Sequence, residues 1–246
     1  WGLMLTGKLM DIDQSVRRDI PGFIKRLSAR IGEPLVRQAV ATALRIMGEQ
    51  FVLGRSIDNA LDRARREGLT CSFDMLGEGA RTPDDAADYA GLYADAIAAV
   101  GTASAGSGPE AGHGVSVKLS ALSPRYEAAQ EARVWHELYP QLKSLAIAAA
   151  RHDINLTVDA EEADRLVLSL KLIDRLAREP ELGSWKGLGL AVQAYQKRGL
   201  AVIEALAGLA RNTGRRLMVR LGKGGYWDSE IKAAQLGGRP DYPVVT

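Results

Sequence analysis

The sequence has little of several things on which whole classes of protein depend. Cys71 is the single cysteine among 246 residues, so an internal disulfide and a cluster of thiolate metal ligands are both excluded. This cysteine usage predicts a cytoplasmic protein. No apolar run approaches the roughly 20 residues that span a bilayer, and the first residues do not form the charged start of a signal peptide.

An excess of charge of one sign is missing too. The chain has 32 basic and 30 acidic residues, a net charge of +2, and no basic stripe stands out, so we expect no nucleic acid to bind this segment. The three histidines, His113, His136 and His152, form no metal-ligand spacing, and we expect no metal site. No activated serine or cysteine nucleophile is indicated either.

What the chain does contain is an average share of apolar and charged residues, 46% and 25%, which is typical of a globular protein. Residues 1–68 have a helical pattern, with apolar residues three and four apart at Val36, Val40, Leu44 and Met47. Residues 69–246 alternate short β-branched runs with amphipathic stretches, which predicts βαβ units. We therefore expect a helical segment over 1–68 and a βα barrel domain over 69–246.

Five strands and four helices are expected in the second part. The strands are residues 70–76, 115–122, 155–160, 188–195 and 217–221, and the helices are 86–100, 131–151, 162–178 and 199–212. Thr82 and Pro83 are typical of the cap and first turn of a helix. Residues 101–114, rich in Gly, Ser and Ala, are expected to be a flexible surface connection.

Strand parity separates an oily face from a small or polar face in each strand. Near the end of each strand the polar face carries a functional group: Asp74, Lys118, Asp159, Gln193 and Arg220. In an α/β barrel of the TIM type, active sites are built at this end. A doubly wound sheet, in which these groups are satisfied by neighbours, stays open as the alternative.

Residues 159–165 hold four carboxylates at a strand-to-helix junction. Glu161, Glu162 and Asp164 are expected in the loop and first helical turn, where the helix dipole favours negative charge. Asp159 differs because its parity places it on the inner face, where a carboxylate needs a partner, and Lys118 is the nearest one. Whether this pair is structural or catalytic stays open.

The run that follows the fifth strand combines three glycines with positive charge and two aromatic rings. Glycines let the backbone approach a ligand, Arg220 and Lys223 supply charge, and Tyr226 and Trp227 supply flat surfaces. This composition suits a phosphorylated aromatic cofactor, although neither a Walker nor a Rossmann spacing is present. A glycine-rich turn with a chance aromatic pair stays open.

Motifs spread over the whole chain resemble one family, the proline dehydrogenase domain of the bifunctional proline utilization A enzymes. They are WGLMLTGK at 1–8, GEQFV at 48–52, FDMLGE at 73–78, VKLSAL at 117–122, PRY at 124–126, DAEEADR at 159–165, QAYQKR at 193–198 and RLGKGGYWDSE at 220–230.

This resemblance implies a distorted (βα)8 barrel, of which this sequence holds the first five strands, with noncovalent FAD. It implies oxidation of L-proline to Δ1-pyrroline-5-carboxylate, with hydride passing from proline C5 to flavin N5 and electrons passing on to a membrane quinone. The implied partners are proline, the quinone and a pyrroline-5-carboxylate dehydrogenase domain in the parent polypeptide. The implied location is cytoplasmic, with peripheral contact at the inner face of the cell membrane.

The resemblance also implies roles for single residues. Catalytic roles fall to Lys118, Asp159, Arg220 and Tyr226. The proline pocket takes Lys118, Asp159, Leu221 and Tyr226, with Glu78 acting indirectly. The cofactor is contacted by Gln193, Arg220, Gly222, Lys223, Gly224, Gly225, Trp227 and Thr246.

The chain departs from the family at Gly222 and Gly225, where Val and Ala are common. The remaining strands, and an eighth helix whose arginines bind the proline carboxylate, have no counterpart before Thr246, so further chain beyond Thr246 is expected. Two other hypotheses stay open. One is a non-catalytic FAD-binding fragment that lacks this carboxylate clamp, and the other is a barrel lyase that uses Lys118 as a Schiff base.

Overall fold

The computed structural model describes residues 33–48, 52–77 and 79–246, and it divides into two compact units, Trp1–Arg63 and Ala64–Thr246. The first unit contains α4 (Glu33–Gly48), so the helix expected around residues 36–47 is confirmed. Helix α5 (Ile57–Glu67) crosses the division and ends one residue before the boundary expected at residue 68. The rest of the expected helical segment, residues 1–32, lies outside the described residues.

The second unit is built on a parallel sheet whose strands follow chain order without a reversal. Its strands are β1 (Ser72–Phe73), β2 (Gly114–Val117), β3 (Asn155–Val158), β4 (Leu188–Gln193) and β5 (Met218–Gly222). A doubly wound sheet would reverse its order at a switch point. The sequential order is that of a barrel wall, and the expectation of a βα barrel with five strands in this chain is confirmed.

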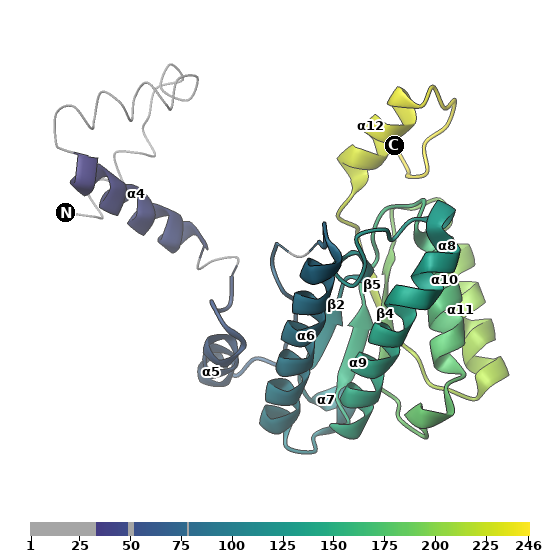
Figure 1. Cartoon of the computed structure of the whole chain (residues 1–246), viewed down its shortest axis with the longest axis horizontal. Coiled ribbons are helices and arrows are strands. Elements are labelled where there is room, and N and C mark those ends of the chain that lie inside the picture. Colours follow the sequence, from purple (N-terminus) through teal and green to yellow (C-terminus); the bar gives the residue numbers. More distant parts are fainter. Residues whose placement is uncertain (1–32, 49–51, 78) are drawn as a thin grey trace. The chain divides into compact units, whose positions relative to one another are not determined.

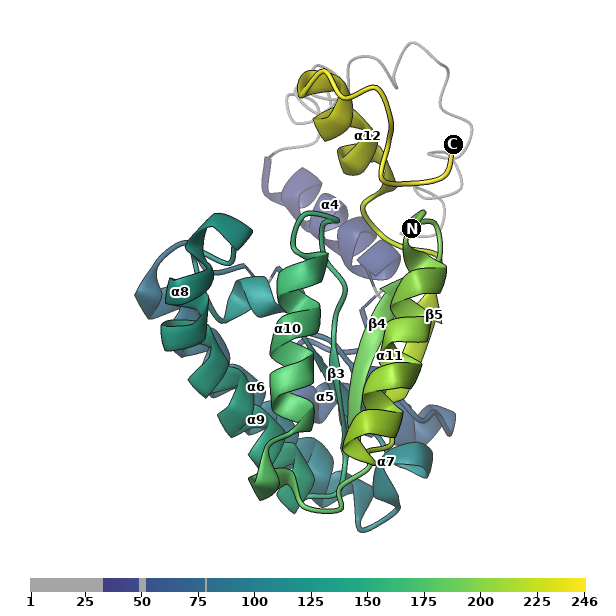
Figure 2. The ribbon, with the colours of Figure 1, turned by 90° about the vertical axis from the view of Figure 1, so that its right-hand side faces the viewer.

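Helices cover one face of this sheet, as Figures 1 and 2 show. They are α6 (Pro83–Ser104), α9 (Tyr139–Arg151), α10 (Leu166–Ala177) and α11 (Gly199–Thr213). Val117, Leu156 and Leu190 point into the layer between sheet and helices and are nearly fully buried. Burying these apolar side chains is the main force that holds helices and sheet together.

The opposite face carries the small and polar side chains that parity predicts. Asn155 Nδ2 donates to the Gly187 carbonyl at 2.9 Å, and Thr157 Oγ1 donates to Asn155 Oδ1 at 2.8 Å. Gly189 lies on this face, where an added Cβ would come within 3.0 Å of Asn155 Nδ2. These buried polar groups hydrogen-bond to one another or to the backbone, so the inner face can bury them.

Helix α6 begins where the sequence predicts. Thr82 Oγ1 accepts from the Asp85 N–H at 3.1 Å, and Asp85 Oδ2 accepts from the Thr82 N–H at 2.9 Å, which forms a reciprocal capping box ahead of Pro83. The helix runs on to Ser104, which is buried with Val100 and Gly101. The expectation of a flexible connection from residue 101 is therefore wrong for its first four residues.

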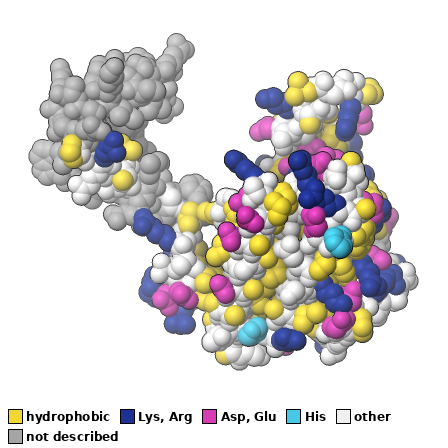
Figure 3. Space-filling model, viewed as in Figure 1, with side chains coloured by type: hydrophobic (Ala, Val, Ile, Leu, Met, Phe, Trp, Pro, Cys, Tyr) yellow, Lys and Arg dark blue, Asp and Glu magenta, His cyan; other side chains and the backbone are white. Residues whose placement is uncertain are grey.

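Short elements and one helix complete the second unit. They are α7 (Gly108–Ala111), η1 (Leu119–Ala121), η2 (Ala128–Gln130), α8 (Glu131–Arg133), η3 (Val134–Leu138), η4 (Pro180–Leu182) and α12 (Trp227–Leu236). In Figure 1, α12 stands at the edge where the strands end. None of the described helices combines the length and apolar character that a membrane span requires. Basic and acidic side chains are interspersed over the second unit on the face that Figure 3 shows.

Candidate functional site

The ends of β2 and β3 bring Lys118 and Asp159 together, as parity predicts. Lys118 Nζ lies 3.0 Å from Asp159 Oδ2 and 3.0 Å from Asp74 Oδ2, so one ammonium group bridges two carboxylates. The Asp159 N–H donates to the Val117 carbonyl at 2.9 Å, which extends the β2–β3 ladder to the aspartate itself. Backbone pairing therefore fixes where the Asp159 carboxylate lies.

Arg220 on β5 reaches Asp159 from the other side. Its guanidinium forms an ion pair with Asp159 Oδ1 and donates to Ser116 Oγ at 2.9 Å. Asp159 is 9% exposed and Arg220 is 45% exposed, so the carboxylate is buried while part of the guanidinium remains open to solvent. With Asp74 and Lys118, these residues form a cluster of two anions and two cations, which we call the charge cluster.

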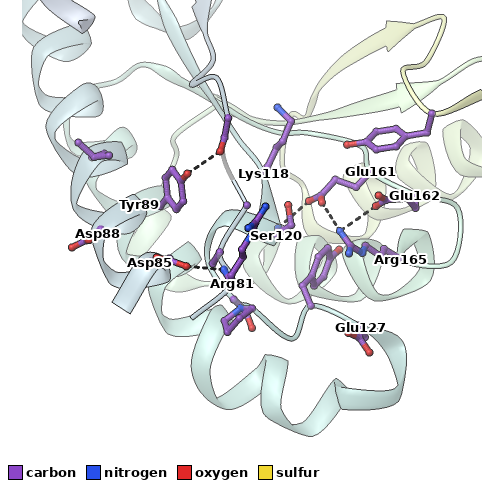
Figure 4. A pocket seen from close by; sticks show the side chains of 18 residues that line it. Arg81, Asp85, Asp88, Tyr89, Lys118, Ser120, Glu127, Glu161, Glu162 and Arg165 are labelled. Atoms are coloured by element: carbon purple, nitrogen blue, oxygen red, sulfur yellow. Dashed lines mark hydrogen bonds and ion pairs between the residues drawn. The ribbon is translucent and has the colours of Figure 1, made fainter. Parts of the chain in front are cut away.

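An open cleft of about 900 Å³ lies beside Lys118 (Figure 4). Lys118, Ser120, Glu161 and Arg165 line one part of it, and Arg81 and Tyr89 line the part formed by the start of α6. Tyr226, which precedes α12, also lines the cleft. The cleft is therefore lined mainly by segments that follow strands β1, β2, β3 and β5.

Glu161 has a larger part in this cleft than the sequence predicts. It is buried, its Oε1 accepts from the Ser120 N–H at 3.0 Å, and its Oε2 pairs with Arg165 Nη1 at 2.7 Å (Figure 4). Helix α10 begins only at Leu166, so Glu161, Glu162 and Asp164 all lie in the loop, and the part of the expectation that placed them in the first helical turn is wrong. Glu161 instead links the loops that follow β2 and β3.

Tyr226 keeps its proton in this setting. Burial, together with the nearby negative charges of Glu161 and Glu162, raises the pKa of its hydroxyl to about 12. Near neutral pH the side chain is therefore a neutral phenol. It can donate one hydrogen bond and present an aromatic ring to a ligand in the cleft.

The glycine-rich loop after β5, residues 222–226, is tied to Gln193 at the end of β4. Gly225 N–H donates to Gln193 Oε1 at 3.2 Å, and Gln193 Nε2 donates to the Glu161 carbonyl at 2.7 Å. The Tyr226 N–H donates to the Tyr195 hydroxyl at 2.7 Å. Gln193 and Tyr195 therefore connect the β5 loop with the loop after β3.

The remaining predicted residues gather at the same end of the sheet. Trp227 Nε1 donates to the Val245 carbonyl at 2.9 Å, which brings the neighbour of Thr246 beside the start of α12. Leu221 and Trp227 are 63% and 42% exposed, so apolar surface is open to solvent there. Glu78 lies outside the described residues.

Three residues of this region did not stand out in the sequence: Glu161, Arg165 and Tyr195. For Glu161 a signal was available, since it follows Asp159 by two positions and so continues its parity. Arg165 completes the pair with Glu161 four residues later. Tyr195 gave no comparable local signal, because most of its partners are distant in sequence, in residues 222–226 and at Val245.

Comparison with known families gives two matches along the chain. Residues 57–246 match a family model described as proline dehydrogenase. Residues 1–51 match a family model described as the DNA-binding domain of proline dehydrogenase. The expectation that this chain binds no nucleic acid stays a prediction, and the description of the second family, which names DNA binding, does not favour it.

Curated relatives cover the chain from end to end. It is 51% identical over 249 residues to the bifunctional protein PutA of Salmonella typhimurium, which covers 100% of this chain and 19% of that protein. It is 26% identical over 202 residues to proline dehydrogenase 1 of Bacillus subtilis, covering 81% of this chain and 59% of that protein. The chain thus spans about a fifth of the bifunctional relative that it matches.

A solved structure supports the same comparison. A crystal structure of a Bradyrhizobium japonicum proline utilization A mutant matches with a TM-score of 0.77 at 54% identity, over 90% of this chain and 23% of that one.

Proposed function

The chain belongs to the proline dehydrogenase family, and we propose that it forms part of a flavoenzyme that oxidises L-proline to Δ1-pyrroline-5-carboxylate. The observation that carries the proposal is the charge cluster of Asp74, Lys118, Asp159 and Arg220, which lies at the carboxyl end of the sheet. The glycine-rich loop follows directly on β5, the strand that carries Arg220. A barrel enzyme builds its catalytic site at this end.

The residues at this end fit FAD. An added Cβ at Gly222 or Gly225 would meet no described atom within 4 Å, so the loop is open on that side to a ligand. Leu221 and Trp227 offer exposed apolar surface to a ring, and Arg220 and Lys223 offer positive charge to phosphates and to the pyrimidine edge of the flavin. We assign cofactor contacts to Gln193, Arg220, Gly222, Lys223, Gly224, Gly225, Trp227 and Thr246.

FAD, when bound, would supply the hydride acceptor for proline C5, and the ring nitrogen would release its proton to solvent as the C5–N double bond forms. The chain's own residues supply position and charge. Lys118 and Asp159 form a fixed ion pair at the proline pocket, and Leu221 and Tyr226 pack on the substrate side. Arg220, held by Asp159 and Ser116, keeps a cation beside the reacting atoms, where negative charge develops.

The proposal extends to the partners of the parent protein. The relatives named PutA are called bifunctional, which supports a second catalytic domain in the same polypeptide, and we assign to it the dehydrogenation of pyrroline-5-carboxylate. A membrane quinone takes the electrons onward. The parent protein is then a cytoplasmic protein that touches the inner face of the cell membrane during turnover, without a span in the described helices.

A Schiff-base lyase is less well supported. Lys118 Nζ donates to both Asp74 and Asp159, an arrangement that stabilises an ammonium group and leaves no lone pair for attack on a carbonyl carbon. A non-catalytic FAD-binding fragment would need the same loop but no charge cluster. The charge cluster therefore favours the oxidoreductase.

The decisive experiment follows flavin absorbance in the full-length protein under anaerobic conditions. We expect flavin bands in the purified protein and bleaching of these bands on addition of L-proline. Bands without proline-dependent bleaching would support the non-catalytic fragment. Absence of flavin, together with borohydride trapping of a carbonyl substrate on Lys118, would support the lyase and overturn the proposal.

A further inference from the structure

Every polar group of Tyr195 is hydrogen-bonded, to Gln193 and to the two segments that meet at the end of β5. Its hydroxyl donates to Gln193 Oε1 at 2.7 Å and accepts from the Tyr226 N–H at 2.7 Å. Its N–H donates to the Lys223 carbonyl at 3.1 Å, and its carbonyl accepts from the Val245 N–H at 2.8 Å.

The ring of Tyr195 shapes the glycine-rich loop as well. A Cβ at Gly224 would overlap the ring atoms Cδ1, Cε1 and Cζ, so the loop backbone lies directly against the ring. Gly224 also has a φ of +123°, a conformation that residues with a side chain rarely adopt. Glycine is therefore required at this position for two independent reasons. The contact also fixes how close the loop backbone lies to the ring.

Two backbone groups set which way the Gln193 amide faces, and the Tyr195 hydroxyl supports that orientation. Gly225 N–H can only donate and the Glu161 carbonyl can only accept, so Oε1 must face Gly225 and Nε2 must face Glu161. The Tyr195 hydroxyl fills the second acceptor site of Oε1. Burial raises the pKa of Tyr195, which keeps this hydroxyl protonated and able to donate.

One hydrogen-bonding group of Gln193 then remains for a ligand. Both lone pairs of Oε1 and one N–H of Nε2 are used within the protein, so the second N–H of Nε2 is left as a donor. A flavin ring exposes acceptors at its pyrimidine edge and at N5 in the oxidised form. A donor of fixed direction recognises such atoms, whereas an amide free to flip would also present its oxygen.

We propose that Tyr195 is a positioning residue for FAD, which fixes the 222–226 loop and holds Gln193 in place as a donor toward the flavin. This inference rests on the proposed function, since it takes FAD as the ligand. Tyr195 touches no reacting atom and acts through Gln193, Gly224 and Tyr226. Its loss should therefore change cofactor affinity and the flavin reduction potential in the resting enzyme.

The test compares Tyr195→Phe with Tyr139→Phe in the full-length protein. Each change deletes one buried hydroxyl. Tyr139 lies on α9, away from the loop, and its hydroxyl donates to Glu179 at 2.6 Å. FAD dissociation constants are measured by quenching of flavin fluorescence with apoenzyme, beside the melting temperature. We expect Tyr195→Phe to weaken FAD binding about tenfold, the effect of one buried donor left without its partner. Tyr139→Phe should lower the melting temperature and leave FAD affinity unchanged.

A double-mutant cycle with Gln193→Glu tests whether Tyr195 acts through Gln193. Glutamate keeps the acceptor oxygen Oε1 and replaces the Nε2 donor with a second acceptor, so the FAD affinity of this variant should already fall. We expect Tyr195→Phe to add little further loss on that background, because coupled residues are not additive. Additive losses, or unchanged FAD affinity and potential in Tyr195→Phe, would overturn the positioning role. If the unmodified protein itself holds no FAD, the proposed function fails instead.

Discussion

The carboxylate of Glu230 accepts a hydrogen bond from the backbone N–H of Ala163 at 2.5 Å, across 67 residues of chain. Arg198 Nη2 donates to the carbonyl of the same Ala163 at 2.6 Å, so this residue is held on both sides. Ala163 belongs to the loop that begins after Asp159, and Glu230 lies in α12. Helix α12 is thereby tied to the loop that carries the charge cluster's buried anion.

Glu230→Gln should change how stability depends on pH. Burial raises the pKa of Glu230, the Ala163 hydrogen bond lowers it, and the charges of Asp164 and Glu162 raise it again, leaving it above its usual value. A raised carboxyl pKa contributes stability that is complete below about pH 4.3 and is lost as pH rises through the folded value. Thermal unfolding of both proteins over this range should show the unmodified chain losing stability relative to Glu230→Gln with rising pH. A constant difference would contradict this.

Thr82→Ala tests the cap of α6. It removes the oxygen that accepts from the Asp85 N–H and should cost about 1 kcal/mol of stability, the usual value for such a cap. Thr82→Ser keeps the oxygen and serves as the control. Denaturant unfolding measures both, and an equal loss in the two variants would show that the hydroxyl is not the stabilising group.

The partner residue of this cap predicts the opposite pH dependence to Glu230. Hydrogen bonds from the backbone N–H groups of Arg81 and Thr82 hold the pKa of Asp85 below its usual value. A lowered pKa contributes stability above about pH 3.9 that is lost as pH falls through the folded value. Asp85→Asn should therefore lose stability relative to the unmodified chain at neutral pH, and the difference should shrink in acid. A difference that grows in acid would exclude this.

Local sequence patterns are sufficient to predict the faces of single strands and the start of a helix. Alternation along β2 and β3 placed Lys118 and Asp159 on one face, and their ion pair follows from the neighbouring positions of two parallel strands. Thr82 and Pro83 are sufficient to locate the start of α6, because a cap involves residues only three apart. Both predictions depend on interactions within one element or between adjacent strands.

The residues that were missed depend on contacts with backbone groups. Glu161 meets Ser120 across 41 residues and Tyr195 meets Tyr226 across 31, and in each case one partner is a backbone N–H. Backbone donors have no residue type, so no letter in the sequence marks them. The start of α10 at Leu166 was missed too, because Arg165 makes no side-chain cap hydrogen bond there.

Gly224→Ala should weaken FAD binding in the full-length protein more than Gly225→Ala does. An added Cβ overlaps the Tyr195 ring at Gly224 and meets no described atom within 4 Å at Gly225. The positive φ of Gly224 adds backbone strain of about 1–3 kcal/mol for a residue with a side chain. Flavin fluorescence titration of the two apoenzymes measures the difference. Equal affinities would mean that the close contact between the Gly224 backbone and the Tyr195 ring does not affect FAD binding.

Arg220→Met should reduce proline-dependent flavin reduction far more than it reduces folding stability. The guanidinium is 45% exposed and contributes little to the core, whereas its charge balances Asp74 and Asp159 together with Lys118. Without it the cluster carries one excess negative charge where negative charge develops during hydride transfer, and we expect a rate loss of about 100-fold. Arg220→Lys keeps the charge but loses the branched guanidinium that reaches both Asp159 and Ser116. Its rate should therefore lie between those of the unmodified protein and Arg220→Met. Anaerobic stopped-flow absorbance gives the rate, and thermal melts of the apoenzymes give the stability. A melting temperature of the Arg220→Met apoenzyme far below that of the unmodified apoenzyme would identify Arg220 as a structural residue. Loss of a charge needed only for the reaction should leave the fold of the apoenzyme intact.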